Sequence, residues 1–181
     1  MNPLATVEAE LLASVLGRND RTLGTRVDAK LDQASVIESL VDASESVLST
    51  MCKITVENTR TSSGCAVRRN ELSGVVGLTG ALRAMVSINV SKDLIFHAAE
   101  SLLGVRPTAM DADVIDLVGE LANMIVGNAK ERLHHKDLIL GLPTVVNGTG
   151  HVVVFPKDMD LSVINFETNV GGLQIELGIK R

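Results

Sequence analysis

Hydrophobic and polar residues repeat with two different periods along this chain, and the periods divide it into helices and strands. Apolar residues spaced by about 3.6 positions predict helices over 32–51, 91–103 and 111–134. Segments that alternate with period two, or are rich in β-branched residues, predict strands between them. These predicted strands are 53–60, 72–79, 82–90, 137–146, 150–156, 160–167 and 172–179.

Residues at the ends of these segments have the chemistry of helix caps and turns. Asp32 or Ser35 offers an N-cap for the first helix. Ser91 caps the second helix, and Gly104 ends it. Turn-forming residues predict bends or tight turns in the strand regions at Gly74, Gly77, Gly80, Asn147–Gly148 and Gly171–Gly172.

The order of elements is helix then strands, followed by helix then strands, which indicates a loose internal duplication. Short turns join the strands, so we expect an α+β fold with a mainly antiparallel sheet covered on one face by the long helices. Residues 4–16 predict a short amphipathic helix, and 17–28 are polar and contain glycine. We therefore divide the chain into an N-terminal arm or linker, 1–28, and one domain, 29–181.

Composition narrows the classes of partner. The 181 residues carry a net charge of −5 and include three Phe but no Trp or Tyr. A phosphate-backbone binder needs a basic field, and base stacking needs aromatic side chains, so we expect no nucleic-acid partner. No apolar run approaches the roughly 18 residues of a membrane span, and the N-terminus lacks the order of a signal peptide. We expect no membrane association and a cytoplasmic location.

Few residues have the spacing of a metal or nucleophile site. Cys52 and Cys65 lack metal-ligand spacing and are interpreted as buried or idle thiols. His134 and His135 are adjacent, so on a helix they point about 100° apart, and we expect no metal role for them. His97 and His151 are isolated and are interpreted as structural. The chain contains no GxSxG, Walker or GxGxxG motif.

The helix predicted over 111–134 carries the candidate chemistry. One broad arc is apolar and should pack on the sheet; it consists of Leu117, Val118, Leu121, Ala122, Met124, Ile125 and Ala129. A single stripe on the opposite side consists of Asp116, Glu120, Asn123, Gly127 and Lys130. Asn128 and Arg132 interrupt this pattern near the C-terminal end.

Two glycines on or beside the stripe, Gly119 and Gly127, are unusual for a solvated helix face. Glycine inside a helix costs about 1 kcal/mol relative to alanine. Either a partner approaches the helix backbone closely there, or the glycines permit tight packing inside this protein. From spacing alone, Glu120 and Asn123 also fit an ordinary solvated face.

The segment from Asp116 through Glu120 and Asn123 to Ala129, DLVGELANMIVGNA, resembles the signature of the CheX/CheC/FliY family of chemotaxis phosphatases. That pattern has Asp or Ser, three residues, Glu, two residues, Asn, and a later Pro. The segment GLPTVV, which contains Pro143, and the following Gly148-X-Gly150-His151 also resemble CheX. Pro143 comes about 20 residues after Asn123, a few fewer than in CheC and FliY. The resemblance covers about 30–181.

The resemblance implies an enzyme that hydrolyses the aspartyl phosphate of a CheY-like receiver domain. By this analogy Glu120 pairs with the receiver lysine and fixes docking, while Asn123 holds the attacking water in line. It also implies partner contacts at Asp116, Gly119, Gly127, Lys130 and Pro143. It further implies that the chain itself binds no cofactor or metal and that Mg²⁺ belongs to the receiver's site.

CheC-type relatives carry a second Glu-x-x-Asn on the other long helix. Here the helix over 32–51 has Glu38 followed by Val41, and Glu45 followed by Leu48. One site for each chain is therefore expected, which resembles CheX and implies a homodimer joined sheet edge to sheet edge. Two alternatives remain open: a docking module that binds receiver or flagellar-switch proteins without turnover, and a structural adaptor that assembles through its edge strands.

Overall fold

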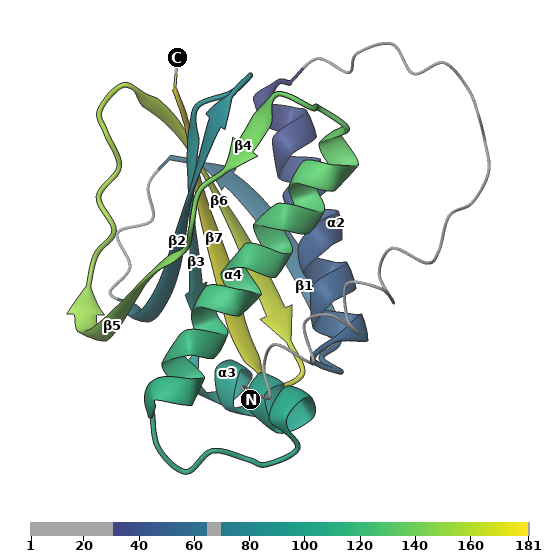
Figure 1. The fold of residues 1–181 in the computed structure, drawn as a ribbon, viewed down its shortest axis with the longest axis vertical. Helices are drawn as coiled ribbons and strands as arrows, with labels where there is room; N and C mark the ends of the chain where they lie inside the picture. Colours follow the sequence, from purple (N-terminus) through teal and green to yellow (C-terminus); the bar gives the residue numbers. More distant parts are fainter. Residues whose placement is uncertain (1–30, 65–69, 181) are drawn as a thin grey trace, which may run out of the picture.

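The computed structural model describes residues 31–64 and 70–180, which form three helices and a seven-stranded sheet (Figure 1). The helices are α2 (Gln33–Thr50), α3 (Lys92–Leu103) and α4 (Ala112–Leu133). The strands are β1 (Val56–Ser63), β2 (Asn70–Gly80), β3 (Ala84–Val90), β4 (Leu138–Leu140), β5 (Thr144–His151), β6 (Met159–Thr168) and β7 (Gly171–Lys180). The predicted arm with its helix over 4–16, and Cys65, lie outside the described residues.

The sheet confirms the predicted α+β class. Its strand order is β1-β6-β7-β3-β2-β4, with β5 also paired to β2. Every pairing between these strands is antiparallel. Helices α2 and α4 lie side by side over one face (Figure 1), and that face carries most of the apolar core. The internal duplication stays a prediction.

The helix caps form where the sequence places them. The Asp32 carboxylate accepts from the backbone N–H of Ser35 at 2.9 Å, and the Ser35 hydroxyl accepts from the N–H of Asp32 at 3.2 Å. Both candidate residues thus take part in one reciprocal capping box, with Asp32 as the N-cap. Ser91 caps α3, and Gly104 ends it with φ +76°, a left-handed conformation that glycine adopts without strain.

The prediction of one continuous strand over 137–146 is wrong, because the strand is interrupted between β4 and β5. Pro143 lacks an N–H to donate to a ladder, and the N–H of Gly141 donates to the carbonyl of Gly77 at 2.8 Å. Both short strands still pair with β2, so together they form one interrupted edge. The predicted strand 150–156 is also wrong, since β5 ends at His151 and 152–158 form a connection.

Two predicted turns fall inside strands. Asn147–Gly148 lies within β5, because Asn147 pairs with Leu72 of β2 and this long-range pairing overrides the local turn preference. At the other position, Asn169 and Val170 make the hairpin turn, and Gly171–Gly172 begins β7. Gly74 and Gly77 likewise lie within β2, while Gly80 ends that strand with φ +94°.

Candidate active site

Helix α4 begins and ends with groups that favour a helix. The Asp111 carboxylate accepts from the backbone N–H of Val114 at 3.1 Å, which satisfies a donor that the first turn leaves unpaired. Asp113 lies in the first turn, and Lys130 and Arg132 lie in the last. Each of these charges is opposite in sign to the nearby end of the helix dipole, which stabilises the helix. His134 terminates the helix in a left-handed conformation.

The two faces of α4 divide as the sequence predicts. The buried face consists of Val114, Leu117, Val118, Gly119, Leu121, Ala122, Ile125, Val126, Ala129 and Leu133. On the opposite stripe Asp116 is exposed, and Glu120, Asn123, Gly127 and Lys130 are half-buried. Met124 is half-buried and packs against the core. An acid and an amide three residues apart therefore leave the same helix on its outer side, where a partner can reach them.

Gly119 is buried because the edge strand runs close beside it. A Cβ atom at Gly119 would lie 3.2 Å from Cγ2 of Val145 and 3.9 Å from Cγ of Pro143. At Gly127 the nearest atom to such a Cβ is Cδ2 of Leu140, at 3.8 Å. Both glycines thus face the β4–β5 edge. Internal packing accounts for Gly119, whereas Gly127 has room for a methyl group and remains partly exposed.

The inner side of α4 rests directly on the backbone of β2. A Cβ atom at Gly74 would lie 2.7 Å from Cβ of Ala122 and 3.1 Å from the carbonyl oxygen of Val118. Real Cβ atoms essentially never approach another atom to 2.7 Å, so the helix position depends on glycine in the strand. The backbone that carries Glu120 and Asn123 is therefore held between β2 below and β5 at the side.

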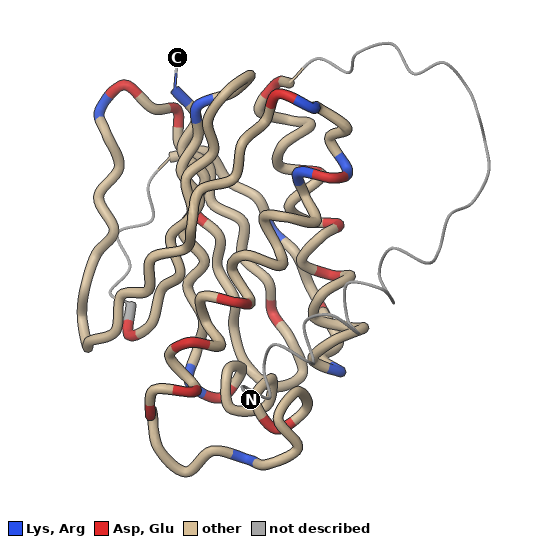
Figure 2. The backbone as a smooth tube through the Cα atoms, viewed as in Figure 1, with Lys and Arg blue, Asp and Glu red and all other residues tan. Residues whose placement is uncertain are grey.

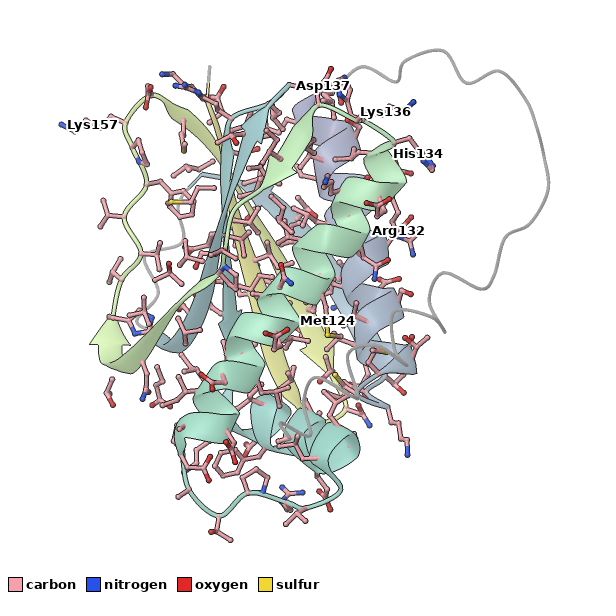
Figure 3. All side chains as sticks on the ribbon, in the orientation of Figure 1. Met124, Arg132, His134, Lys136, Asp137 and Lys157 are labelled. Carbon is pink, nitrogen blue, oxygen red and sulfur yellow. The ribbon has the colours of Figure 1, made fainter. Side chains whose placement is uncertain are left out.

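Of the two residues that interrupt the sequence pattern, Arg132 lies toward α2 (Figure 3). Nη1 of Arg132 is 3.7 Å from Oδ2 of Asp42 on α2. Both side chains are substantially exposed, so this ion pair contributes little to stability. It does explain why a long basic residue lies on the α2 side of α4. Asn128 is half-buried.

Charge is distributed unevenly along α4 (Figure 2). Asp113, Asp116 and Glu120 make the first half acidic, whereas Lys130 and Arg132 lie near the C-terminal end. A positive group on a docking protein is therefore attracted to the half of the helix that carries Glu120.

Other reactive groups in the described part of the chain offer no competing chemistry. Burial raises the pKa of Cys52 to about 12, so its thiol is not a nucleophile at neutral pH. No group of three or more His, Cys, Asp or Glu side chains in 31–64 and 70–180 is placed to hold a metal ion. None of the helices among these residues is long and apolar enough to cross a membrane.

Sequence reasoning missed a polar cluster on the sheet face opposite α2 and α4. It includes Ser73 of β2, Asn89 of β3 and Glu176 of β7, all buried. His151, interpreted above as isolated, contacts Ser73 with its Nε2 atom at 2.7 Å. A signal was present, because serine, asparagine and glutamate occupy alternate positions between apolar residues in these strands. Their convergence depends on strand order, which one sequence does not reveal.

Comparison with known proteins finds a matching family model and several solved structures with a similar fold. The family model described as "Chemotaxis phosphatase CheX" matches residues 72–167. No protein with a curated description matches the sequence significantly. A CheC-like superfamily protein from Shewanella sp. PV-4 is 27% identical with a TM-score of 0.76, and the match covers 83% of this chain and 100% of that one.

Two further solved structures have the same fold. The chemotaxis protein CheX from Vibrio vulnificus is 27% identical with a TM-score of 0.71, over 80% of this chain and 99% of that one. CheX from Borrelia burgdorferi, in a CheX-CheY-BeF3-Mg complex, is 20% identical with a TM-score of 0.67, over 81% and 98% of the two chains. The α+β fold described above is thus the fold of CheX and CheC-like structures.

Proposed function

This chain belongs to the CheX family of chemotaxis phosphatases, and from that premise we propose that it hydrolyses the aspartyl phosphate of a CheY-like receiver domain. The observation that carries the proposal is the pair Glu120 and Asn123, which leave the outer side of α4 three residues apart. A pure docking surface does not require an acid and an amide in this register. The reaction requires both a fixed docking position and an oriented water.

Asn123 is the proposed catalytic residue. Its amide can accept a hydrogen bond from the attacking water and donate another, which holds the water in line with the phosphorus. Orienting a reactant in this way can lower a barrier by several kcal/mol. The half-buried position of Asn123, on a helix held by β2 and β5, supports this role because less rotamer freedom is lost on docking.

Glu120 is the proposed docking residue, and a lysine of the receiver is its proposed partner. The acidic first half of α4 attracts such a positive group. Asp116, one turn earlier and exposed, is the proposed contact with the rim of the receiver. The Mg²⁺ that assists the reaction belongs, in this proposal, to the receiver's site. The Borrelia burgdorferi CheX was solved with CheY, BeF3 and Mg, which supports the choice of partner class.

The decisive experiment follows the loss of phosphoryl label from a Mg²⁺-loaded CheY-type receiver, with and without this protein. We expect the wild-type chain to accelerate hydrolysis. Asn123→Ala should lower turnover at least about a hundredfold, as loss of one well-placed polar group in an active site does, while docking is mostly retained. Asn128→Ala is the matched control, because Asn128 lies on the same helix and is also half-buried.

The outcomes separate the enzyme from its alternatives. Acceleration that Asn123→Ala removes and Asn128→Ala preserves supports the phosphatase with its water-orienting amide. Binding to the receiver without any acceleration by the wild-type chain would favour the docking module. An interaction that is independent of phosphorylation would favour the structural adaptor.

We also propose that the chain forms a homodimer through the edge made by β4, β5 and the connection after them. Among the described residues, four of the five exposed large hydrophobic side chains lie on this stretch: Ile139, Leu142, Val152 and Val154. An edge strand offers unpaired backbone groups, and exposed apolar residues beside it favour association. Sedimentation analysis of wild type and Ile139→Lys tests this, since a wild-type monomer would exclude the dimer.

A further inference from the structure

The edge formed by β4 and β5 is one residue longer than the part of β2 with which it pairs. Val75 pairs with Thr144 of β5. Leu78 pairs with Leu140 of β4. Between these two pairs β2 supplies two residues, whereas the edge supplies three, 141–143. One residue of the edge therefore has no partner in β2, and the edge carries a β-bulge at this point.

Leu142 is the unpaired residue of this bulge. The N–H of Gly141 donates to the carbonyl oxygen of Gly77 at 2.8 Å, which continues the register of β4. The register of β5 places Pro143 opposite Val76. Leu142 lies between these two edge residues, and its side chain is 93% exposed, the highest value among the exposed large hydrophobic residues in 31–64 and 70–180. The bulge thus leaves a leucine almost wholly in solvent.

The backbone on both sides of Leu142 is constrained. Gly141 lies directly against β2, since a Cβ atom there would be 3.2 Å from the carbonyl oxygen of Gly77. The ring of Pro143 fixes its own φ angle and restricts the preceding residue, Leu142, to an extended backbone. A side chain on such a backbone loses little freedom when a partner buries it, so more of the gain from burial remains as affinity.

The bulge lies level with Asn123 of α4. Positions 119, 123 and 127 follow one another at intervals of four residues, so they form one row along the helix. Gly119, at one end of this row, faces Pro143. Gly127, at the other end, faces Leu140. Asn123 is midway, about 6 Å along the helix axis from each glycine, and the segment of the edge beside it is therefore the bulge.

The other exposed apolar residue of β4 lies on a different side of the sheet. Ile139 and Leu140 are successive residues of this strand, so their side chains lie on opposite faces. Leu140 faces α4, which places Ile139 on the face away from the helix. A bulge also interrupts the ladder that an added strand would need. Leu142 is thus separated from the contact between copies of this chain, which Ile139 tests, and adjoins the candidate site instead.

We propose that Leu142 is the apolar anchor of the receiver complex and inserts into an apolar recess beside the receiver's phosphorylated aspartate. The inference rests on the proposed function, because it takes the receiver as the protein that docks on α4. Glu120 and Asn123 provide charge and an amide but little apolar area. The strongest contacts of an interface are buried side chains near its centre, surrounded by weaker polar contacts. The β4–β5 edge, one wall of the candidate site, supplies such a side chain.

The anchor also selects among receivers. A receiver with an apolar recess at this place gains affinity when Leu142 leaves water. A receiver with a charged or amide side chain there would have to bury that polar group against leucine without a hydrogen bond, which is unfavourable. The chemical class of the partner is therefore a phosphorylated receiver whose surface next to the aspartyl phosphate is apolar.

Binding of the full chain to a CheY-type receiver loaded with BeF3 and Mg²⁺ tests the anchor, together with steady-state dephosphorylation of the same receiver. The Borrelia burgdorferi complex contains this combination of groups. Leu142→Ala should raise Kd at least about tenfold through lost apolar burial. KM should rise in parallel and kcat at saturating receiver should stay unchanged, because Leu142 does not touch the reacting atoms. Leu142→Met, apolar and similar in volume, should keep Kd near the wild-type value.

Val105→Ala and Ile139→Ala are the matched controls. Val105 is 71% exposed and Ile139 is 59% exposed, so both changes also remove apolar surface from solvent. We expect wild-type Kd and KM in both variants. Leu142→Ala should keep the wild-type Tm, because its side chain is almost wholly in solvent, and the wild-type state of association in sedimentation analysis.

The outcomes separate the anchor from the proposed reaction. The anchor is overturned if Leu142→Ala binds within about twofold of wild type, if it lowers kcat at an unchanged Kd, or if weaker binding accompanies a changed state of association. A wild-type chain that binds the loaded receiver but does not accelerate dephosphorylation would overturn the phosphatase alone, and weaker binding by Leu142→Ala would still support the anchor. A wild-type chain that does not bind the receiver overturns both.

Discussion

Helices α2 and α4 lie on the same face of the sheet and bury similar aliphatic stripes, yet only α4 has the features of a site. In α2 the residues three positions after its glutamates are Val41, packed against the core, and Leu48, buried within it. Glu45 accepts a hydrogen bond from the Thr59 hydroxyl of β1 at 3.2 Å. In α4 the residue three positions after Glu120 is Asn123, which lies at the surface.

The surroundings of the two helices differ as well. Helix α4 lies on Gly74 of β2 and alongside the β4–β5 edge, with Gly119 facing Val145. The sequence of α2 contains no glycine, and this helix packs against α4 and β1. A glutamate on a helix surface is therefore common to both. What distinguishes α4 is an amide in register with that glutamate and a backbone that packs on Gly74 and beside the β4–β5 edge.

The largest effect in this comparison should come from Glu120→Ala set against Glu38→Ala. Loss of Glu120 removes the proposed partner of the receiver lysine, so we expect kcat/KM for receiver dephosphorylation to fall at least about thirtyfold, equivalent to about 2 kcal/mol. Binding to the receiver should weaken in parallel. Glu38 is exposed on the neighbouring helix, and its removal should leave both quantities unchanged. Equal losses in the two variants would show that the acid acts only through net charge.

The second effect concerns the way β2 supports α4. An alanine at Gly74 would place its Cβ 2.7 Å from Cβ of Ala122, so the helix or the strand must move. We expect a loss of about 1–3 kcal/mol in the free energy of unfolding, and a lower Tm at about 2–4 °C per kcal/mol. Thermal unfolding followed by circular dichroism measures it. Gly77→Ala is the control in the same strand, because no atom lies within 4 Å of its Cβ, and it should not destabilise the fold.

The sequence predicts the helices well because their signals are local. Asp32, Ser91 and Gly104 cap or end helices through bonds to residues three or four positions away. The outer stripe of α4 likewise follows from helical geometry alone. Helical spacing is therefore enough to place Glu120 and Asn123 on one surface.

Features that depend on distant strands are not predictable in the same way. The interruption between β4 and β5 at Pro143 depends on the hydrogen bond from the N–H of Gly141 to the carbonyl of Gly77 in β2. Asn147–Gly148 looks like a turn until β2 pairs with it. The polar network from His151 to Glu176 joins four strands, and no spacing within one segment points to it. In each case a tertiary contact determines the local structure, and a single sequence does not reveal the strand order.

A smaller effect distinguishes two interpretations of Gly127. Its added Cβ would make an ordinary contact with Leu140 at 3.8 Å, so Gly127→Ala should stabilise the protein by about 1 kcal/mol through helix propensity. Chemical denaturation measures this gain. If the glycine serves only internal packing, receiver binding stays unchanged. If a partner approaches the helix backbone there, binding weakens although the fold becomes more stable, and Gly127 belongs to the docking surface.

The smallest effect on activity, none at all, is expected when the motif is copied to α2. Val41→Asn places an amide three residues after Glu38, but Val41 packs against the core and its helix packs against α4 and β1 instead of β5. Introduced into Asn123→Ala, this change should not restore receiver dephosphorylation. The label-release assay decides the matter, with the Asn123→Ala parent as the control. Restored turnover would mean that a glutamate and an amide in helical register suffice, and that the wall formed by β5 contributes nothing to the chemistry. Continued inactivity, with the fold verified by circular dichroism, would assign the difference between the helices to their surroundings as well as to their sequences.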